Sequence, residues 1–346
     1  MTEEENIRYN RQIILPSWGL EAQEKVKASK VLIIGAGGLG CPVISYLAAA
    51  GVGTIAIMDF DVVEISNLQR QVIYNMKDIG MNKAAAASQT IRAFNPLVNL
   101  ITIEEGLEKS NALKIIEQYD IVVDATDNFE TRYLINDACV ILNKPFVFAS
   151  ILGFEGQVSV FNYNDGPTYR CLYPEPPSPE NAPNCNDNGV LGTLAGTIGC
   201  IQANEVLKII SGVGETLSGK LLIVDLLNNR FSNFSITTVQ ANKEIKTLGD
   251  YNIVCNSDKI EFLPKGKFTE KFLQTTHLSI DVSDEYEFTP IEKDSKNIPL
   301  YEIEDYQFEN NNIPVILYCK SGLRSKQAAM ILSKKGIKNI YCLTNN

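Results

Sequence analysis

The segment Gly35-Ala-Gly-Gly-Leu-Gly40 constrains the fold of this chain most, because it directly follows an apolar run at residues 31–34. Pro42 then lies in the first turn of an expected helix, where proline is tolerated, and a second apolar run follows at residues 54–58. Strand, glycine turn, helix and strand in this order predict a βαβ crossover in a parallel sheet. Backbone N–H groups of such a turn can bind phosphate at the helix N-terminus. The expected phosphate contacts are Gly35, Gly37, Gly38 and Gly40.

The same alternation of apolar runs and helical segments continues to about residue 150, which predicts an α/β fold with an open sheet. A length of 346 residues favours two domains of unequal size. Near residues 240–265 the composition changes to short charged pieces, and a smaller α/β pattern follows. We expect a nucleotide-binding domain over 1–245, a linker over 246–266 and a smaller domain over 267–346. Expected strands are 31–34, 54–58, 98–103, 121–123, 146–148, 157–161, 221–225, 278–282, 314–318 and 337–343, with helices at 83–94, 198–210 and 325–335.

Composition excludes several classes of ligand and location. The net charge of −10 and the pI of about 4.9 argue against nucleic acid or anionic lipid as a partner. The acidic N-terminus does not resemble a signal peptide, and no apolar run is long enough to cross a bilayer, so we expect a cytoplasmic protein. The eight cysteines lack the spacing of a disulfide scaffold. Those in expected helices, Cys41, Cys139 and Cys200, are predicted to pack in the interior.

Polar residues after the second strand separate two kinds of nucleotide enzyme. Asp59 ends that strand and would bond ribose hydroxyls in any nucleotide, so by itself it also fits an NAD-dependent oxidoreductase. Asp61 follows Asp59, and a polar, cationic group then converges on the same end of the sheet: Asn67, Arg70, Gln71 and Lys83. Cations beside phosphates favour attack at phosphorus and departure of pyrophosphate over hydride transfer. The alternative for Arg70 and Lys83 is an ordinary solvated surface.

Carboxylates follow another apolar run at residues 121–123. Asp124 and Asp127 lie at a strand end, which is where ligands of open α/β sheets bind. A carboxylate beside triphosphate oxygens is a natural Mg²⁺ ligand, so the metal could bind at Asp124 or Asp127. Asn128 follows Asp127 and is an expected nucleotide contact.

Together these motifs resemble the MoeB and ThiF family of adenylyltransferases, relatives of the ubiquitin-activating enzymes, over roughly residues 6–240. The resemblance implies a Rossmann-like open sheet of that type and a homodimer. It also implies that ATP and Mg²⁺ activate the C-terminal glycine carboxylate of a ubiquitin-like sulfur-carrier protein ending in Gly-Gly. The motifs are Arg8-Tyr-Asn-Arg-Gln-Ile13, residues 35–41, Asp59-Phe-Asp61, Ser66-Asn-Leu-Gln-Arg70, Lys83 and Asp124-Ala-Thr-Asp-Asn-Phe129.

The resemblance also implies residue roles. Arg11 would reach the phosphates of the neighbouring subunit, although Arg8 and Arg11 taken alone would be an exposed N-terminal arm. Asp127 would serve the metal. A carrier-binding scaffold without turnover is a further alternative, which the intact cationic group argues against. The residues implied to hold ATP are Gly38, Asp59, Asn67, Arg70 and Lys83.

Cysteines outside the helices are candidates for sulfur chemistry. Cys185 lies in a polar loop where a thiol would be accessible, and the resemblance places the family's transfer cysteine there. The family often has a structural zinc held by two C-x-x-C pairs, whereas here Pro174 follows Cys171 and Asn252 precedes Cys255 at that spacing. With two of four sulfur ligands missing, we expect no zinc.

The tail contains a second candidate site, Cys319-Lys-Ser-Gly-Leu-Arg324, between an expected strand and helix. Backbone amides at a helix N-terminus lower a thiol's pKa. The loop resembles that of rhodanese sulfurtransferases, which implies that Cys319 and Arg324 act in sulfur transfer. A cysteine phosphatase is the alternative, but it needs five residues between Cys and Arg, not four. Ser283 departs from the arginine common in rhodaneses, and the domain is expected to lack its last helix.

The sequence therefore predicts adenylation of a sulfur carrier followed by sulfur transfer to give its thiocarboxylate. A persulfide donor such as a cysteine desulfurase is the implied sulfur source. The resemblance leaves open whether the pathway is that of molybdopterin or of the thiamin thiazole.

Overall fold

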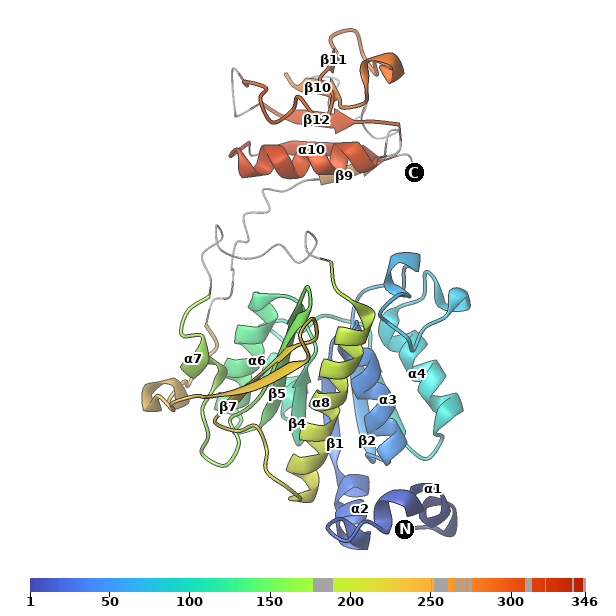
Figure 1. Cartoon of the computed structure of the whole chain (residues 1–346), viewed down its shortest axis with the longest axis vertical. Helices are drawn as coiled ribbons and strands as arrows, with labels where there is room; N and C mark the ends of the chain where they lie inside the picture. The colour runs from blue at the N-terminus through green and yellow to red at the C-terminus, as the bar shows by residue number, and fades with distance from the viewer. Residues whose placement is uncertain are drawn as a thin grey trace. The chain divides into compact units, whose positions relative to one another are not determined.

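A computed structural model of the chain describes residues 1–176, 189–249, 251, 261–264, 268, 272, 276–308, 313–320, 322–337 and 339–344. The chain divides into two compact units, the larger ending at Ile253 and the smaller continuing from Val254 to Asn346. Each unit has a sheet of its own (Figure 1). Within the described residues, no helix combines the length and the apolar character that crossing a bilayer requires.

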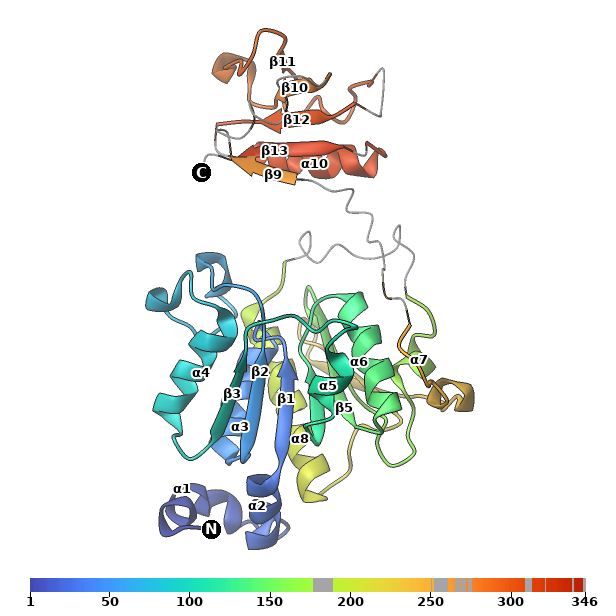
Figure 2. The same cartoon turned by 180° about the vertical axis from the view of Figure 1, so that it is seen from behind.

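The larger unit contains one eight-stranded sheet in the order β3-β2-β1-β4-β5-β6-β7-β8. Pairing is parallel from β3 to β5 and antiparallel from β5 to β8. The carboxyl ends of β1, β2 and β4 therefore meet at one edge (Figure 2). The strands are β1 (Lys30–Ile34), β2 (Thr54–Met58), β3 (Asn99–Ile103), β4 (Ile121–Asp124), β5 (Phe146–Leu152), β6 (Glu155–Phe161), β7 (Lys220–Asp225) and β8 (Arg230–Ser235).

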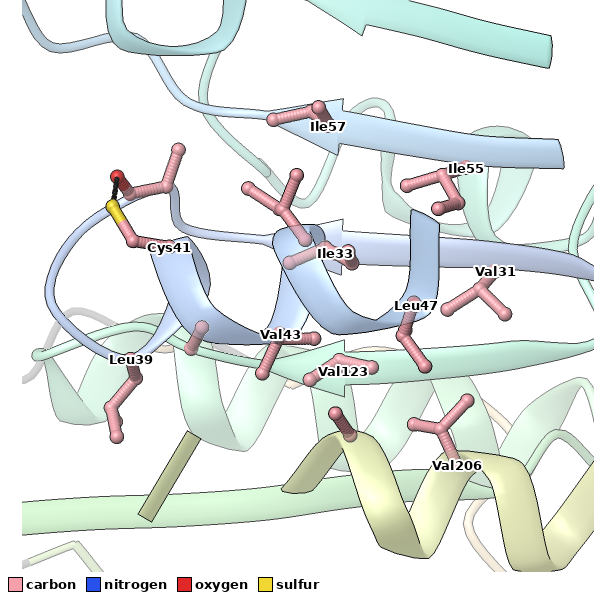
Figure 3. Packing of buried hydrophobic residues seen from close by; sticks show 14 of the residues in the cluster. Val31, Ile33, Leu39, Cys41, Val43, Leu47, Ile55, Ile57, Val123 and Val206 are labelled. Carbon is pink, nitrogen blue, oxygen red and sulfur yellow. Dashed lines mark hydrogen bonds between the residues drawn. The ribbon is translucent and has the colours of Figure 1, made fainter. Parts of the chain in front are cut away.

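Helices cover both faces of this sheet, because its parallel strands are apolar on both sides. Alternate residues of β1 enter different cores: Val31 and Ile33 pack with α3 and α8, whereas Leu32 and Ile34 pack with α5 and α6. Figure 3 shows the first of these cores. The helices are α1 (Glu3–Ile13), α2 (Gly19–Ala28), α3 (Gly40–Ala50), α4 (Lys83–Phe94), α5 (Ala112–Ile116), α6 (Phe129–Ile141), α7 (Tyr169–Leu172) and α8 (Gly192–Ser211).

The smaller unit is built on a five-stranded parallel sheet in the order β11-β10-β12-β13-β9. Its core joins apolar residues of the three central strands to Ala328, Ala329 and Leu332 of the helix that follows β12. The elements are β9 (Glu261–Pro264), β10 (Leu278–Asp281), β11 (Lys296–Asn297), β12 (Val315–Tyr318), α10 (Leu323–Lys334) and β13 (Ile340–Thr344).

The expected elements agree with the structure where the local pattern is strong. Helix α4 and strand β2 have the predicted bounds, and all the other predicted elements exist with shifted ends. Helix α8 begins at Gly192, not at 198; its first turns are rich in Gly and Thr, which are weak helix formers, so the sequence did not reveal this start. Strand β8 was not predicted. All six of its residues are exposed, so no alternation of apolar and polar residues marks it.

Candidate active sites

The glycine turn lies against the end of β4. Gly35 has a φ of +97°, and its N–H donates to the Met58 carbonyl at 2.8 Å. A Cβ on Gly35 would lie 2.5 Å from the Ala125 carbonyl oxygen, and one on Gly40 would lie 2.0 Å from that of Gly35. Only glycine fits these two positions, so the turn can bring its backbone close to a ligand at the N-terminus of α3.

Asp59 orders this turn from the end of β2. Its carboxylate accepts hydrogen bonds from the backbone N–H groups of Ala36, at 2.7 Å, and Asp61, at 2.9 Å. Burial raises the pKa of Asp59, and the two hydrogen bonds only partly oppose that rise. Each carboxylate oxygen keeps a further lone pair, so the predicted contact with ribose hydroxyls remains geometrically available.

Lys83 lies beside Asp59, at the first position of α4. Its Nζ is 2.8 Å from an Asp61 carboxylate oxygen, and the residue is only 8% exposed. This excludes the solvated-surface alternative for Lys83. An ammonium group has three donors, so Lys83 can hold Asp61 and still donate to a phosphate.

Asn67 and Arg70 lie on the segment that crosses the glycine turn. Asn67 is buried, and its Oδ1 accepts from the Glu64 N–H at 3.1 Å. The Arg70 guanidinium donates to the Ser66 carbonyl at 3.1 Å, and its stem lies against Gly38, where a Cβ would be 3.6 Å from Arg70 Cγ. The structure thus brings the cations of residues 70 and 83 to the same turn.

Asp127 and Asn128 follow β4 on the other side of the turn, and the carboxylate residue is exposed. Asn128 is the N-cap of α6, and its Oδ1 accepts from the Thr131 N–H at 2.8 Å. The side chain that was predicted to contact the nucleotide therefore also stabilises a helix end. Asp124 is fully buried, and burial raises its pKa although Arg132 lies 3.6 Å away. The buried Asp124 therefore has a structural role at the start of the loop that follows β4, whereas Asp127 is exposed to solvent.

Two residues that support the site were not identified from the sequence. The Tyr74 hydroxyl lies 2.7 Å from the Ala36 carbonyl and 3.1 Å from the Lys83 carbonyl and can donate its one hydrogen to either, which ties the glycine turn to α4. Asn82 caps α4 and donates to the Asp59 carbonyl at 2.9 Å. The sequence could have identified Asn82 as a capping residue, because it directly precedes Lys83 at the start of the helix, whereas no local pattern indicates a role for Tyr74.

Arg11 does not belong to this cluster within one chain. It is exposed in the last turn of α1, which packs at the opposite end of β1 (Figure 1). Tyr9 anchors that helix: its hydroxyl accepts from Asn95 Nδ2 at 3.0 Å, and its ring fills the space that a Cβ on Gly51 would need. Arg8 donates to the Phe94 carbonyl and lies over the Phe94 ring, so it is a packing residue.

The second predicted site lies between β12 and α10. Cys319 is buried, and its sulfur accepts the Gly322 N–H at 3.1 Å and lies 3.7 Å from the Ser325 hydroxyl. Gly322 has a φ of +82°, which turns the chain into the helix. Arg324 occupies the first turn of α10 and forms ion pairs with Asp284 and Glu287.

The remaining cysteines divide by burial. Cys41 and Cys139 are fully buried, and burial raises the pKa of Cys41 to about 12, so neither is a nucleophile. Cys200 is half-buried and lines a groove with Phe231, so it is not packed in the interior as predicted. Cys185 lies outside the residues that the structure describes.

Cys171 has polar neighbours. Its sulfur accepts from the backbone N–H groups of Val239, at 3.3 Å, and Thr168, at 3.4 Å. Burial raises the pKa of Cys171, but hydrogen bonds outweigh burial and lower it below its usual value. The described residues contain no group of three or more metal-ligating side chains, and Cys255 lies beyond them. The expectation of no zinc stays a prediction.

Residues 9–246 match the ThiF family, and residues 268–345 match the rhodanese-like domain. The chain belongs to the ThiF family. It is 41% identical to the probable adenylyltransferase/sulfurtransferase MoeZ of Mycobacterium tuberculosis, over 98% of this chain and 91% of that protein. It is also 41% identical to the adenylyltransferase and sulfurtransferase MOCS3 of Drosophila yakuba, over 95% and 79%.

Solved structures agree on the fold. The crystal structure of selenomethionine PaaA aligns with a TM-score of 0.60 at 26% identity, over 69% of this chain and 76% of that one. Escherichia coli MccB with succinimide aligns with a TM-score of 0.61 at 23% identity, over 72% and 75%.

The predicted fold and enzyme class, an ATP-dependent adenylyltransferase fused to a rhodanese-like sulfurtransferase, are confirmed, and the oxidoreductase, scaffold and phosphatase alternatives are set aside.

Substituting Gly35 by alanine tests the phosphate loop. We expect Gly35→Ala to weaken ATP binding about tenfold or more, because the new Cβ displaces the turn from Ala125. Calorimetric titration with ATP measures this change. The matched control is Gly196→Ala, where a Cβ meets nothing within 4 Å, and ATP affinity should be unchanged. Equal affinity of the two variants would refute the role of the turn.

Proposed function

We propose that this protein adenylates the C-terminal glycine carboxylate of a ubiquitin-like sulfur carrier ending in Gly-Gly and then transfers sulfur to it. Residues 1–245 carry out the adenylation, residues 246–266 are the linker, and residues 267–346 supply sulfur. The product is a thiocarboxylate at the end of the carrier.

Two cations beside a glycine turn support this function most directly. Asp61 holds Lys83, and the stem of Arg70 lies on Gly38, so both cations are positioned before the substrate arrives. A carrier carboxylate attacking the α-phosphorus of ATP forms a P–O bond to AMP while the bond to pyrophosphate breaks. Cations fixed in advance stabilise the charge that gathers on the leaving oxygens.

Magnesium fits the donor set of this site. Mg²⁺ bound with a nucleotide needs one or two protein carboxylates, because phosphate oxygens and waters complete its coordination. The exposed Asp127, at the end of β4, is suited to that role. When bound, the ion would neutralise charge on the phosphates.

Sulfur transfer follows at the activated carbonyl. A persulfide on Cys319 attacks the acyl adenylate: a C–S bond forms, the C–O bond to AMP breaks and AMP leaves, which gives an acyl disulfide on Cys319. A second thiolate then attacks the Cys319 sulfur, so that a disulfide forms between the two cysteines, the S–S bond to the carrier breaks and the carrier leaves as its thiocarboxylate. An external dithiol reduces the new disulfide. Cys185 acts as the transfer cysteine. A cysteine desulfurase charges Cys319, and the carrier belongs to molybdopterin or thiamin thiazole synthesis in the cytoplasm.

Arg11 completes the adenylation site of a second subunit in a homodimer. This assignment is supported by its position in α1, at the opposite end of β1 from the glycine turn of its own chain. An exposed arginine there is available to the phosphates of a partner. The N-terminal helix is fixed by Tyr9 and Arg8, which leaves Arg11 on a rigid support.

Carrier-dependent exchange of pyrophosphate into ATP tests the adenylation step. Arg70→Ala and Asp127→Ala should each lower exchange about 100-fold or more, because each removes a preorganised charge. Arg92→Ala, an exposed arginine of α4, is the matched control and should retain full exchange. Retention of full exchange by both site variants would show that the site is wrongly assigned.

Mixed dimers test Arg11. Arg11→Ala and Arg70→Ala are each expected to be inactive, but coexpressed subunits should recover about a quarter of the wild-type exchange. Random pairing makes half of the dimers hybrid, and each hybrid has one site with both arginines. No recovery, with hybrids verified by differential tags, would place Arg11 outside the partner's site.

Replacing the sulfur-bearing residue separates the two reactions. Cys319→Ser should abolish thiocarboxylate formation and leave carrier-dependent exchange unchanged, since adenylation needs no thiol. Mass spectrometry of the carrier detects the product. Cys139→Ser, at a buried thiol of the other unit, is the control. Undiminished thiocarboxylate formation in Cys319→Ser would exclude this cysteine as the sulfur carrier.

A further inference from the structure

The guanidinium of Arg324 is held by two carboxylates. Its Nη1 lies 3.2 Å from Asp284 Oδ2, and its Nη2 contacts Glu287 Oε2. Both acids lie on the segment after β10, far from Arg324 in sequence. The hydrogen bond that Arg324 donates to Glu287 is the main reason that the pKa of Arg324 is raised, and the charges of Glu287 and Asp284 add to it. One positive charge therefore faces two negative ones.

The segment that carries these acids is pinned to the sheet. Asp281, at the end of β10, is buried, and its two carboxylate oxygens accept the N–H groups of Ser283, at 2.9 Å, and Thr289, at 3.1 Å. Asn297 Nδ2 also donates to the Asp281 and Ser283 carbonyls, at 3.0 and 2.9 Å. The acids are thus held from both ends in a fixed loop.

The ion pairs lie close to the reacting sulfur. Arg324 is the second residue of α10, and Gly322, just before that helix, donates its N–H to Cys319 Sγ at 3.1 Å. Ser325, the next residue, lies 3.7 Å from the same sulfur. Arg324 also interacts electrostatically with Cys319, so its charge and those of its two partners act at the reacting sulfur.

An arginine without acidic neighbours at this position would attract anions, whereas the positive charge of Arg324 is offset by two carboxylates. Arg324 contributes one positive charge, and the two carboxylates that contact it contribute two negative ones, so these three side chains carry a net charge of −1. The balance repels a dianion such as thiosulfate more strongly than a persulfide, whose sulfane sulfur carries at most one negative charge.

We propose that Asp284 and Glu287 determine donor specificity at Cys319: by compensating Arg324 they exclude small anionic sulfur donors and leave cysteine persulfides as substrates. They act through Arg324 and are not catalytic residues. This inference rests on the proposed sulfur transfer by Cys319 and names the residues that set the donor preference of that site.

The step that they control is balanced without a redox partner. The Cys319 thiolate attacks the terminal sulfur of a donor persulfide, a new S–S bond forms at Cys319, the donor S–S bond breaks, and the donor leaves as a thiolate. With thiosulfate the same attack would release sulfite. The chemistry is identical, so discrimination between donors must come from the charge around the sulfur.

Alkylation of Cys319 measures that charge directly in the full chain. The ratio of the rates with iodoacetate, an anion, and iodoacetamide, its neutral analogue, is followed on the Cys319 peptide by mass spectrometry. Asp284→Asn/Glu287→Gln should raise this ratio at least about threefold at low salt, and should lower the KM for thiosulfate about tenfold or more. A change in access alone would alter both alkylation rates together.

Glu285→Gln is the matched control for the single variant Asp284→Asn, because each removes one negative charge and Glu285 is an exposed residue with no described contact to Arg324. An unchanged ratio in the double variant, or a ratio in Asp284→Asn no larger than in Glu285→Gln, would overturn the inference. If the double variant fails to fold, Asp284→Asn retains the Glu287 contact and is judged by the same ratio. Alkylation needs no sulfur transfer, so its outcome is independent of the Cys319→Ser test.

Discussion

Parallel pairing of β1 with β2 and β4 is the constraint on which the adenylation site depends. It places the ends of three strands at one edge, so that side chains after each strand meet there. The edge is crowded, and the turn fits only because Gly35 and Gly40 have no side chain to collide with the neighbouring carbonyls. Backbone N–H groups, Asp59 and Lys83 come together as a consequence of that approach.

Both candidate sites hold their cations with carboxylates before any substrate is present. Lys83 is paired with Asp61, and Arg324 with Asp284 and Glu287. The two sites differ in the number of acids that pair with each cation, and therefore in the net charge of the pair. One acid for one ammonium leaves donors for phosphate, whereas two acids for one guanidinium leave a net negative charge beside a sulfur. The same kind of ion pair thus favours an anionic ligand in one unit and disfavours it in the other.

The fold was predictable wherever the local pattern matched the tertiary environment. Strand β2 and helix α4 have the expected bounds, because buried apolar runs and an alanine-rich face leave little choice. Strand β8 was missed because both of its faces are exposed, and the start of α8 was missed because its first turns are rich in Gly and Thr, which are weak helix formers. Tyr74 was missed because its two carbonyl partners are distant in sequence.

The sequence by itself determined the chemistry: a glycine turn after a strand, acids and cations after the next ones, and a cysteine loop before a helix, each a local pattern of few residues. Tertiary structure decided which of these side chains are buried and which already pair with another residue. It buried Asp124, used Asn128 as a helix cap, placed Arg11 at the opposite end of the sheet and paired Arg324 with acids far along the chain. Burial and pairing depend on contacts between distant segments, which no local spacing records.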